Sequence, residues 1–351
     1  MKRSIAAAIL VALAFLPIAA AQAQEKAPEP SLIELWQKSG HGNSQSSAFT
    51  HWNDEGEIPV NCAACHSGEG FRAFHGLDGS TPGGVDQPIA TGGVVDCATC
   101  HEDGIKEIAT IRFPSGAEIT PPRGTATCLT CHQGRAAGNS VDQQTANMVD
   151  DEVNVELAFV NPHYAVAAAT LFGSQVKGGY EYPGQDYSGQ FAHVDAFSSC
   201  IDCHDPHSTQ VKELSCTSCH EGETLRTIRT SKTDFDGDGD VTTGIYSEIS
   251  SLKAKLLLAI ETYAAERTET PITYASRYPY FFIADTELTY ANRYNAWTPA
   301  LLRAAYNYQF VTMDKGAYAH NPHYAVQVLH DSITDLAHRA PGINIELGPR
   351  P

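Results

Sequence analysis

All ten cysteines of the chain fall in one repeated pattern, in which two cysteines separated by two residues are followed directly by a histidine. The five units, numbered motifs 1 to 5 in chain order, are Cys62-Ala-Ala-Cys65-His66, Cys97-Ala-Thr-Cys100-His101, Cys128-Leu-Thr-Cys131-His132, Cys200-Ile-Asp-Cys203-His204 and Cys216-Thr-Ser-Cys219-His220. Two thiols at this spacing can each bond one vinyl group of the same haem, and the following imidazole can then ligate its iron. The pattern therefore predicts five covalently attached haem c groups.

Zinc binding and disulfide bonding are the two other uses of such cysteines. Zinc would take the C-x-x-C pairs two at a time in closed four-ligand sites, and an exported protein could join its cysteines in disulfides. Neither explains a histidine after every second cysteine. Only 15 of 351 residues are histidine, so five chance placements have a probability on the order of 10⁻⁷.

The spacing of the motifs predicts how the chain is organised around them. Motifs 4 and 5 begin at residues 200 and 216, close enough for their haems to be neighbours. The intervening segments, such as 76–93 and 177–189, are rich in Gly, Pro, Asp and Ser, which favour turns. We expect a loop-rich haem-binding region over residues 24–230, with short helices and with haems in place of much of the usual apolar core.

Residues 247–351 contain no haem motif and have a helical pattern instead. Apolar side chains recur at helical spacing at Leu252, Leu256, Leu257, Ile260 and Tyr263. Residues 297–308 and 322–339 repeat the pattern, with Pro299 and Pro322 suited to first helical turns. The predicted fold is mainly α, with these helices packed against the haem region, and the many tyrosines of this part are expected to pack in the core and at haem edges.

The five motifs, together with Cys203-His204-Asp205-Pro206-His207, resemble those of bacterial multihaem c-type cytochromes. The region from Trp36 to Leu336 is similar to a group of exported cytochromes of this kind. The resemblance implies electron transfer in the periplasm or outside the cell, with redox proteins or an extracellular acceptor as partners. Related proteins also polymerise into haem filaments, so a homo-oligomer or a filament is a further possibility.

Ten histidines remain after the five of the motifs, and five irons need at most five distal ligands. The resemblance implies distal ligands upstream of the first motif and in the C-H-D-P-H sequence. The candidates are His41, His51, His163, His193, His207, His320 and His323. His75 is a weaker candidate, and His330 and His338 are expected to be structural or on the surface. Because 161–166 and 321–326 share the sequence Asn-Pro-His-Tyr-Ala-Val, we expect comparable roles for the two segments.

The supply of histidines bears on function. An iron with two histidine ligands has no open position for a substrate, whereas a five-coordinate iron can bind and transform a small molecule. The count therefore favours a non-enzymatic electron carrier with mostly bis-histidine haems.

The main alternative is an oxidoreductase with one open haem. Pentahaem nitrite reductases and hydroxylamine-oxidising enzymes are similar in haem density and in their helical C-terminal part. Such an enzyme would act on a small nitrogen or sulfur compound such as nitrite, hydroxylamine or tetrathionate, and Tyr318, His320 and His323 could line its pocket. The C-x-x-C-K motif of nitrite reductases is absent, which counts against this alternative. A purely structural or calcium-binding surface protein would not need five redox centres.

An acidic segment at 231–246 joins the two regions. Asp234, Asp236, Asp238 and Asp240 follow the order D-x-D-x-D-G that opens an EF-hand-type calcium loop, with Gly239 at the turn position. The twelfth position is Ile245 rather than Glu, and Glu248 could replace it. We predict a structural Ca²⁺ here, against the alternative of a solvated acidic turn.

The N-terminus reads as a secretory signal peptide over residues 1–23. Lys2 and Arg3 precede an apolar run that ends in Ala21-Gln22-Ala23, a small-residue cleavage pattern. We expect a periplasmic or extracellular protein with no membrane span once this segment is removed. The formal charge of −18 argues against nucleic-acid binding as the main function.

Overall fold

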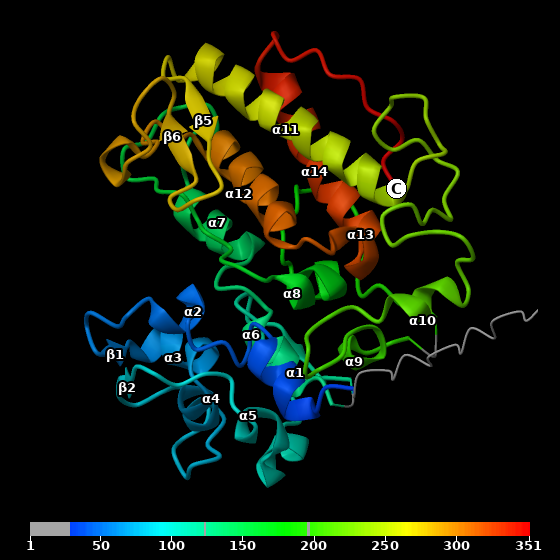
Figure 1. Cartoon of the computed structure of the whole chain (residues 1–351). Coiled ribbons are helices and arrows are strands. Elements are labelled where there is room, and N and C mark those ends of the chain that lie inside the picture. Colours follow the sequence, from blue (N-terminus) through cyan, green and yellow to red (C-terminus); the bar gives the residue numbers. More distant parts are fainter. Residues whose placement is uncertain (1–28, 123, 195–196) are drawn as a thin grey trace, which may run out of the picture.

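The computed structural model describes residues 29–351 apart from 123 and 195–196, so the predicted signal peptide lies outside the described residues. Helices predominate (Figure 1), which confirms the mainly α prediction. Among the described residues, no helix combines the length and the apolar character that crossing a bilayer requires.

The first part of the chain contains short helices separated by loops, as the turn-rich composition predicts. They are α1 (Leu32–Lys38), α2 (Ser47–Thr50), α3 (Val60–His66), α4 (Gly68–Phe74), α5 (Ala98–His101), α6 (Ala126–Cys131), α7 (Gly138–Thr145), α8 (Ala167–Phe172), α9 (Cys200–Cys203) and α10 (Glu213–Thr217), with 3₁₀ turns η1 (Asp103–Glu107) and η2 (Gly173–Gln175). Two antiparallel pairs also lie here, β1 (Glu57–Ile58) with β2 (Ile89–Ala90), and β3 (Ile111–Arg112) with β4 (Glu118–Ile119).

The C-terminal part contains the long helices. They are α11 (Ile245–Arg267), α12 (Pro299–Met313), the short α13 (Ala317–His320) and α14 (Pro322–Arg339). The antiparallel strands β5 (Ile272–Tyr274) and β6 (Phe281–Ile283) and the turn η3 (Tyr290–Asn292) lie between α11 and α12. In Figure 1, α11, α12 and α14 lie side by side in the upper half of the molecule, and all three pairs are in contact.

Local sequence explains where these helices begin and which faces they bury. The Thr298 hydroxyl accepts the N–H of Leu301 at 3.1 Å and caps α12, whose first residue is Pro299. On α11, Leu252, Leu256 and Ile260 lie on one face and are fully buried. The predicted helical spacing is thus confirmed.

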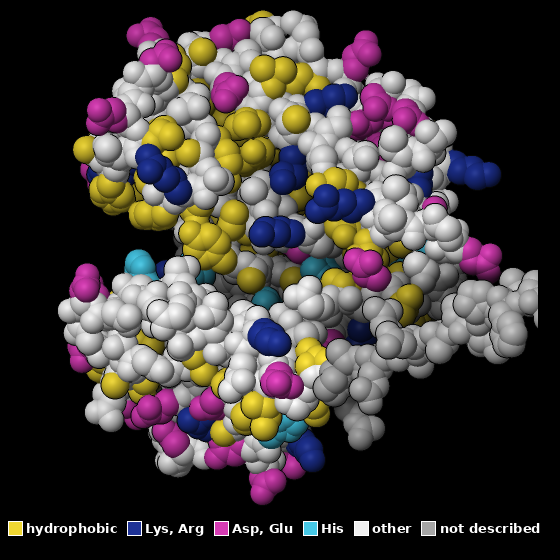
Figure 2. Space-filling view, in the orientation of Figure 1, with side chains coloured by type: hydrophobic (Ala, Val, Ile, Leu, Met, Phe, Trp, Pro, Cys, Tyr) yellow, Lys and Arg dark blue, Asp and Glu magenta, His cyan; other side chains and the backbone are white. Residues whose placement is uncertain are grey.

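One large apolar cluster joins the two regions. It contains residues from the 111–180 segment, such as Leu129 and Phe172, as well as the buried faces of α11, α12 and α14. A second, small cluster of Ile58, Ala63 and Ile89 lies under motif 1. On the face shown in Figure 2, a groove runs between the two halves, and histidine side chains are visible inside it.

Candidate functional site

Each C-x-x-C-H motif lies on or at the end of a short helix. Motifs 1 to 4 coincide with α3, α5, α6 and α9, and motif 5 begins within α10. All ten thiols are free of disulfide bonds. The helical turn places both thiols and the following imidazole of one motif on neighbouring positions, as attachment to a single haem requires.

Each motif histidine faces one second histidine across a similar gap. The distances between ring centroids are 6.0 Å for His66 and His163, 6.1 Å for His101 and His207, 6.3 Å for His132 and His41, 6.4 Å for His204 and His320, and 6.1 Å for His220 and His193. No second histidine is shared between two motifs.

The size of this gap fits one metal ion between two imidazoles. With a metal–nitrogen distance of about 2 Å on each side, the two ring centroids are about 6 Å apart. By comparison, the edge-to-face pair of His51 and Trp52, in direct contact, has its centroids 4.7 Å apart. The donor set therefore fits an iron with two axial histidines at all five motifs.

Two of the seven predicted distal candidates lie elsewhere. His51 contacts Trp52, and His323 lies 6.3 Å from the ring of Phe235. Among the histidines not proposed as main candidates, His75 is bound to the hydroxyl of Thr130 at 3.0 Å, and His330 to the carbonyl of Gly348 at 3.2 Å. Burial lowers the pKa of His75 to about 4.

Three of the five facing histidines are held by the same local hydrogen bond. In each, an oxygen of the side chain two residues earlier accepts the histidine N–H: Ser39 for His41 at 3.2 Å, Asn161 for His163 at 2.9 Å and Asp205 for His207 at 3.2 Å. Such turns fix the backbone without help from regular structure. A polar residue two positions before a histidine was the sequence signal available for these sites.

The repeated Asn-Pro-His-Tyr-Ala-Val segment adopts two different conformations. Asn321 caps α14 by accepting the N–H of Tyr324 at 3.1 Å, and His323 then lies in the first helical turn. In the first copy Asn161 accepts the N–H of His163 instead, and His163 and Ala165 have φ values of 76° and 54°. The structure thus gives the two copies different local geometries, and only His163 faces a motif histidine.

Burial keeps several of these imidazoles neutral. It lowers the pKa of both His132 and His163 to about 4. The neutral imidazole is the form that binds a metal ion.

The outer nitrogens of two paired histidines have defined partners. Nδ1 of His66 lies 2.7 Å from the carbonyl oxygen of Ala48. Nδ1 of His320 lies 2.8 Å from both oxygens of Asp314, whose side chain is 1% exposed. Burial would lower the pKa of His320, but the adjacent Asp314 carboxylate outweighs it and raises that pKa. Nothing in the sequence pattern marks Asp314 for this role.

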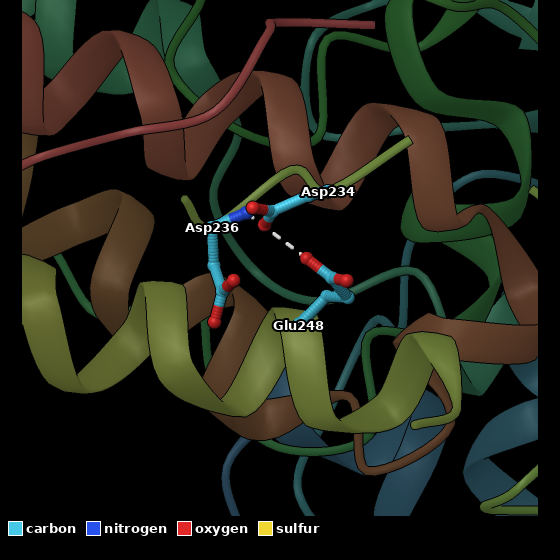
Figure 3. A group of neighbouring side chains, drawn as sticks. All are labelled: Asp234, Asp236 and Glu248. Atoms are coloured by element: carbon cyan, nitrogen blue, oxygen red, sulfur yellow. Dashed lines mark hydrogen bonds between the residues drawn. The ribbon is translucent and has the colours of Figure 1, made fainter. Parts of the chain in front are cut away.

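The acidic loop brings together only part of the predicted calcium set. Asp234, Asp236 and Glu248 have carboxylate oxygens within 4.8 Å of one another (Figure 3), whereas Asp238 and Asp240 are outside this group. Glu248 is already engaged: it accepts the N–H of Asp236 at 2.9 Å and pairs with Arg229 at 2.5 Å. Burial raises the pKa of Asp236.

Asp314 also lines a cavity of about 370 Å³. Its polar lining includes Arg226, Lys253 and Lys315. No cysteine or histidine of the five motifs is among its lining residues.

Comparison with known proteins gives distant relatives of one kind. No family model matches the chain. It is 24% identical to the C-type polyheme cytochrome OmcB of Geobacter sulfurreducens, over 82% of this chain and 45% of that protein, and 24% identical to OmcC of the same species, over 85% and 40%. The solved structure of the outer cell wall cytochrome OcwA is 18% identical over 87% of this chain and 50% of its own, with a TM-score of 0.45.

The chain therefore spans less than half the length of the curated relatives it matches. Both relatives are polyhaem cytochromes by name. Their similarity supports the interpretation of this chain as a multihaem c-type cytochrome with covalently bound haem c.

Proposed function

From this likeness to multihaem c-type cytochromes, we propose that the chain is a pentahaem electron-transfer protein. It passes electrons between redox partners in the periplasm or outside the cell. One observation carries the proposal: five motif histidines face five different second histidines, each across a gap of about 6 Å.

In this proposal each motif binds one haem through its two thiols, and the facing histidines provide the axial ligands. The ligand pairs are His66 with His163, His101 with His207, His132 with His41, His204 with His320, and His220 with His193. Each bound haem supplies a one-electron couple between ferric and ferrous iron. Because the two imidazoles of each pair already face each other, they would hold the iron with little rearrangement of the protein.

The ligand pairing also argues for a carrier rather than for an oxidoreductase. A substrate needs an open iron position, and the geometry offers a second imidazole at every motif. His320, considered in the sequence for a substrate pocket, faces His204 instead. No second function is advanced.

The test is low-temperature EPR of the purified, fully oxidised protein, on a sample whose haem content has been counted. Only low-spin ferric signals, integrating to five haems per chain, are expected. A high-spin signal equal to one haem in five would overturn the carrier proposal, and nitrite, hydroxylamine and sulfur oxyanions would then be tried as substrates.

A further inference from the structure

Motif 3 is in direct contact with motif 1. The thiol of Cys65 lies 3.7 Å from the carbonyl oxygen of Thr130, and the thiol of Cys131 lies 3.8 Å from that of Ala64. The contact is reciprocal, because each motif reaches the backbone beside the other's second cysteine.

Motif 3 contacts motifs 2 and 4 through its opposite end. The hydroxyl of Thr127 donates to the carbonyl oxygen of Thr99 in motif 2 at 3.3 Å and lies beside the Cys100 thiol. The thiol of Cys128 lies next to that of Cys200 in motif 4. Motif 3 therefore touches three other motifs.

Motif 5 is joined to the others through motif 4. The N–H of Lys212, at the start of α10, donates to the carbonyl oxygen of Cys203 at 2.8 Å, and α9 and α10 are in contact.

Burial distinguishes motif 3 from motifs 4 and 5, and motif 2 is also at the surface, with Cys97 and Cys100 exposed. In α6, which carries motif 3, Leu129 and Thr130 are 1% and 2% exposed. Neither α9 nor α10 has a buried residue, and Leu214 of α10 is 87% exposed. Motif 3 lies inside the molecule, and motif 5 lies at its surface.

We propose that motif 3 is the junction of a branched haem array, in which motifs 1 and 2 each connect to it and motif 4 continues the path to a surface terminus at motif 5. The inference rests on the proposed function, because it orders the haems that this function requires. Thioether bonds would attach each haem at the two thiols of its motif, so motifs that contact each other would hold their haems closest together. Electron-transfer rates fall steeply with distance, and electrons from motifs 1 and 2 therefore meet at motif 3 before reaching motif 5.

A direct route between motifs 1 and 2 is the competing arrangement. The helix α4, which follows motif 1, packs on α5, and Arg72 binds Asp96 at 2.9 Å. This contact does not involve the thiols of either motif. A direct route would make motifs 1 to 3 a ring instead of two branches.

The experiment compares two distal-ligand variants, His41→Met at motif 3 and His207→Met at motif 2. Methionine in place of histidine raises the potential of a haem, and a redox titration of each variant must show that the altered haem is reduced first. Each variant is loaded with one electron per molecule, which removes the spin of that haem, and the EPR signals of the four remaining ferric haems are compared with those of the fully oxidised variant. Five haems per chain and an unchanged far-UV circular dichroism spectrum are required of both variants.

For H41M we expect changed spin coupling in three of the four remaining signals, and for H207M in one. Changes in two or more signals for H207M, or in fewer than three for H41M, would overturn the junction. If the proposed function itself fails, the wild-type protein does not show five low-spin signals, so the two failures are distinguishable.

Discussion

The carboxylate of Asp314 faces Nδ1 of His320 with both oxygens at 2.8 Å. Among the described residues, Asp314 has the one buried carboxylate within hydrogen-bond distance of a proposed ligand. A carboxylate in this position accepts the Nδ1 proton, orients the ring and makes the other nitrogen a stronger electron donor. A fixed negative charge near the iron also favours the ferric state.

We therefore expect Asp314→Asn to raise the midpoint potential of one haem of the five. A tenfold change in the ferric-to-ferrous ratio corresponds to about 59 mV for one electron, and a shift of this order is expected. An EPR-monitored redox titration measures it. Asp331→Asn is the matched control, because Asp331 is also buried but binds Arg350 and Tyr187 instead of a proposed ligand. Equal shifts in both variants would contradict the role of Asp314.

The repeated hexapeptide provides a second test within the same chain. His163→Ala removes a ring that faces His66, whereas His323→Ala removes one that lies against Phe235. We expect one haem in five of H163A to become high-spin in the ferric state, or to bind a new exogenous ligand at its iron. H323A should keep five low-spin signals. The ligand assignment is wrong if the two variants give the same EPR spectrum.

The calcium prediction can be tested on the acidic loop. Asp236 is buried and carries a raised pKa, which indicates that its charged form lacks sufficient compensation. We expect Ca²⁺ to raise the unfolding temperature, Asp236→Asn to abolish that effect, and Asp240→Asn, outside the group of three, to weaken it less. If the unfolding temperature does not respond to Ca²⁺ or to a chelator, the calcium prediction is wrong, and Arg229 is the cation that compensates the carboxylates of this loop.

Acid should weaken the attachment of the C-terminal tail to α14. Burial raises the pKa of Asp331, but the neighbouring His330 and the hydrogen bonds from Arg350 and Tyr187 outweigh it and hold that pKa below its ordinary value. The stabilisation is therefore present above the ordinary carboxyl range near pH 3.9 and is lost as the pH falls through the lower folded value.

Asp331→Asn should therefore cost about 1–3 kcal/mol at neutral pH and flatten the loss of stability below pH 4. Chemical denaturation at several pH values measures both effects. An unchanged pH profile in the variant would show that other carboxylates, such as Asp150 with its arginine partners, dominate acid unfolding.

Much of the helical scaffold follows from the sequence, because local signals determine it. Pro299 and Pro322 mark the first turns of α12 and α14, and apolar spacing identifies the buried face of α11. The motifs are likewise local, so their positions on short helices follow from the sequence. Of the tyrosines expected in the core, Tyr280 and Tyr306 are buried, but Tyr278 and Tyr290 stack on each other at the surface.

The pairing of histidines could not be derived from the sequence, because it depends on contacts between distant segments. His204 and His320 meet only when α13 lies beside the haem region, and no local pattern reports that contact. The two Asn-Pro-His segments show the same limit: one asparagine oxygen caps a helix and the other closes a turn, according to what packs around each. Glu248, expected from the sequence as a calcium ligand, shows the same limit. It pairs with Arg229, which lies outside the acidic loop.

The order of the proposed ligands along the chain has a consequence for biosynthesis. A polypeptide emerging N-terminus first would complete the pair at motif 3 as soon as His132 appears, because His41 precedes it. Motif 4 would wait for His320, after the pairs at the other four motifs have been made. A chain truncated before α13 would thus carry all five attachment sequences, but the haem at motif 4, on the path between the interior and motif 5, would lack its proposed second ligand.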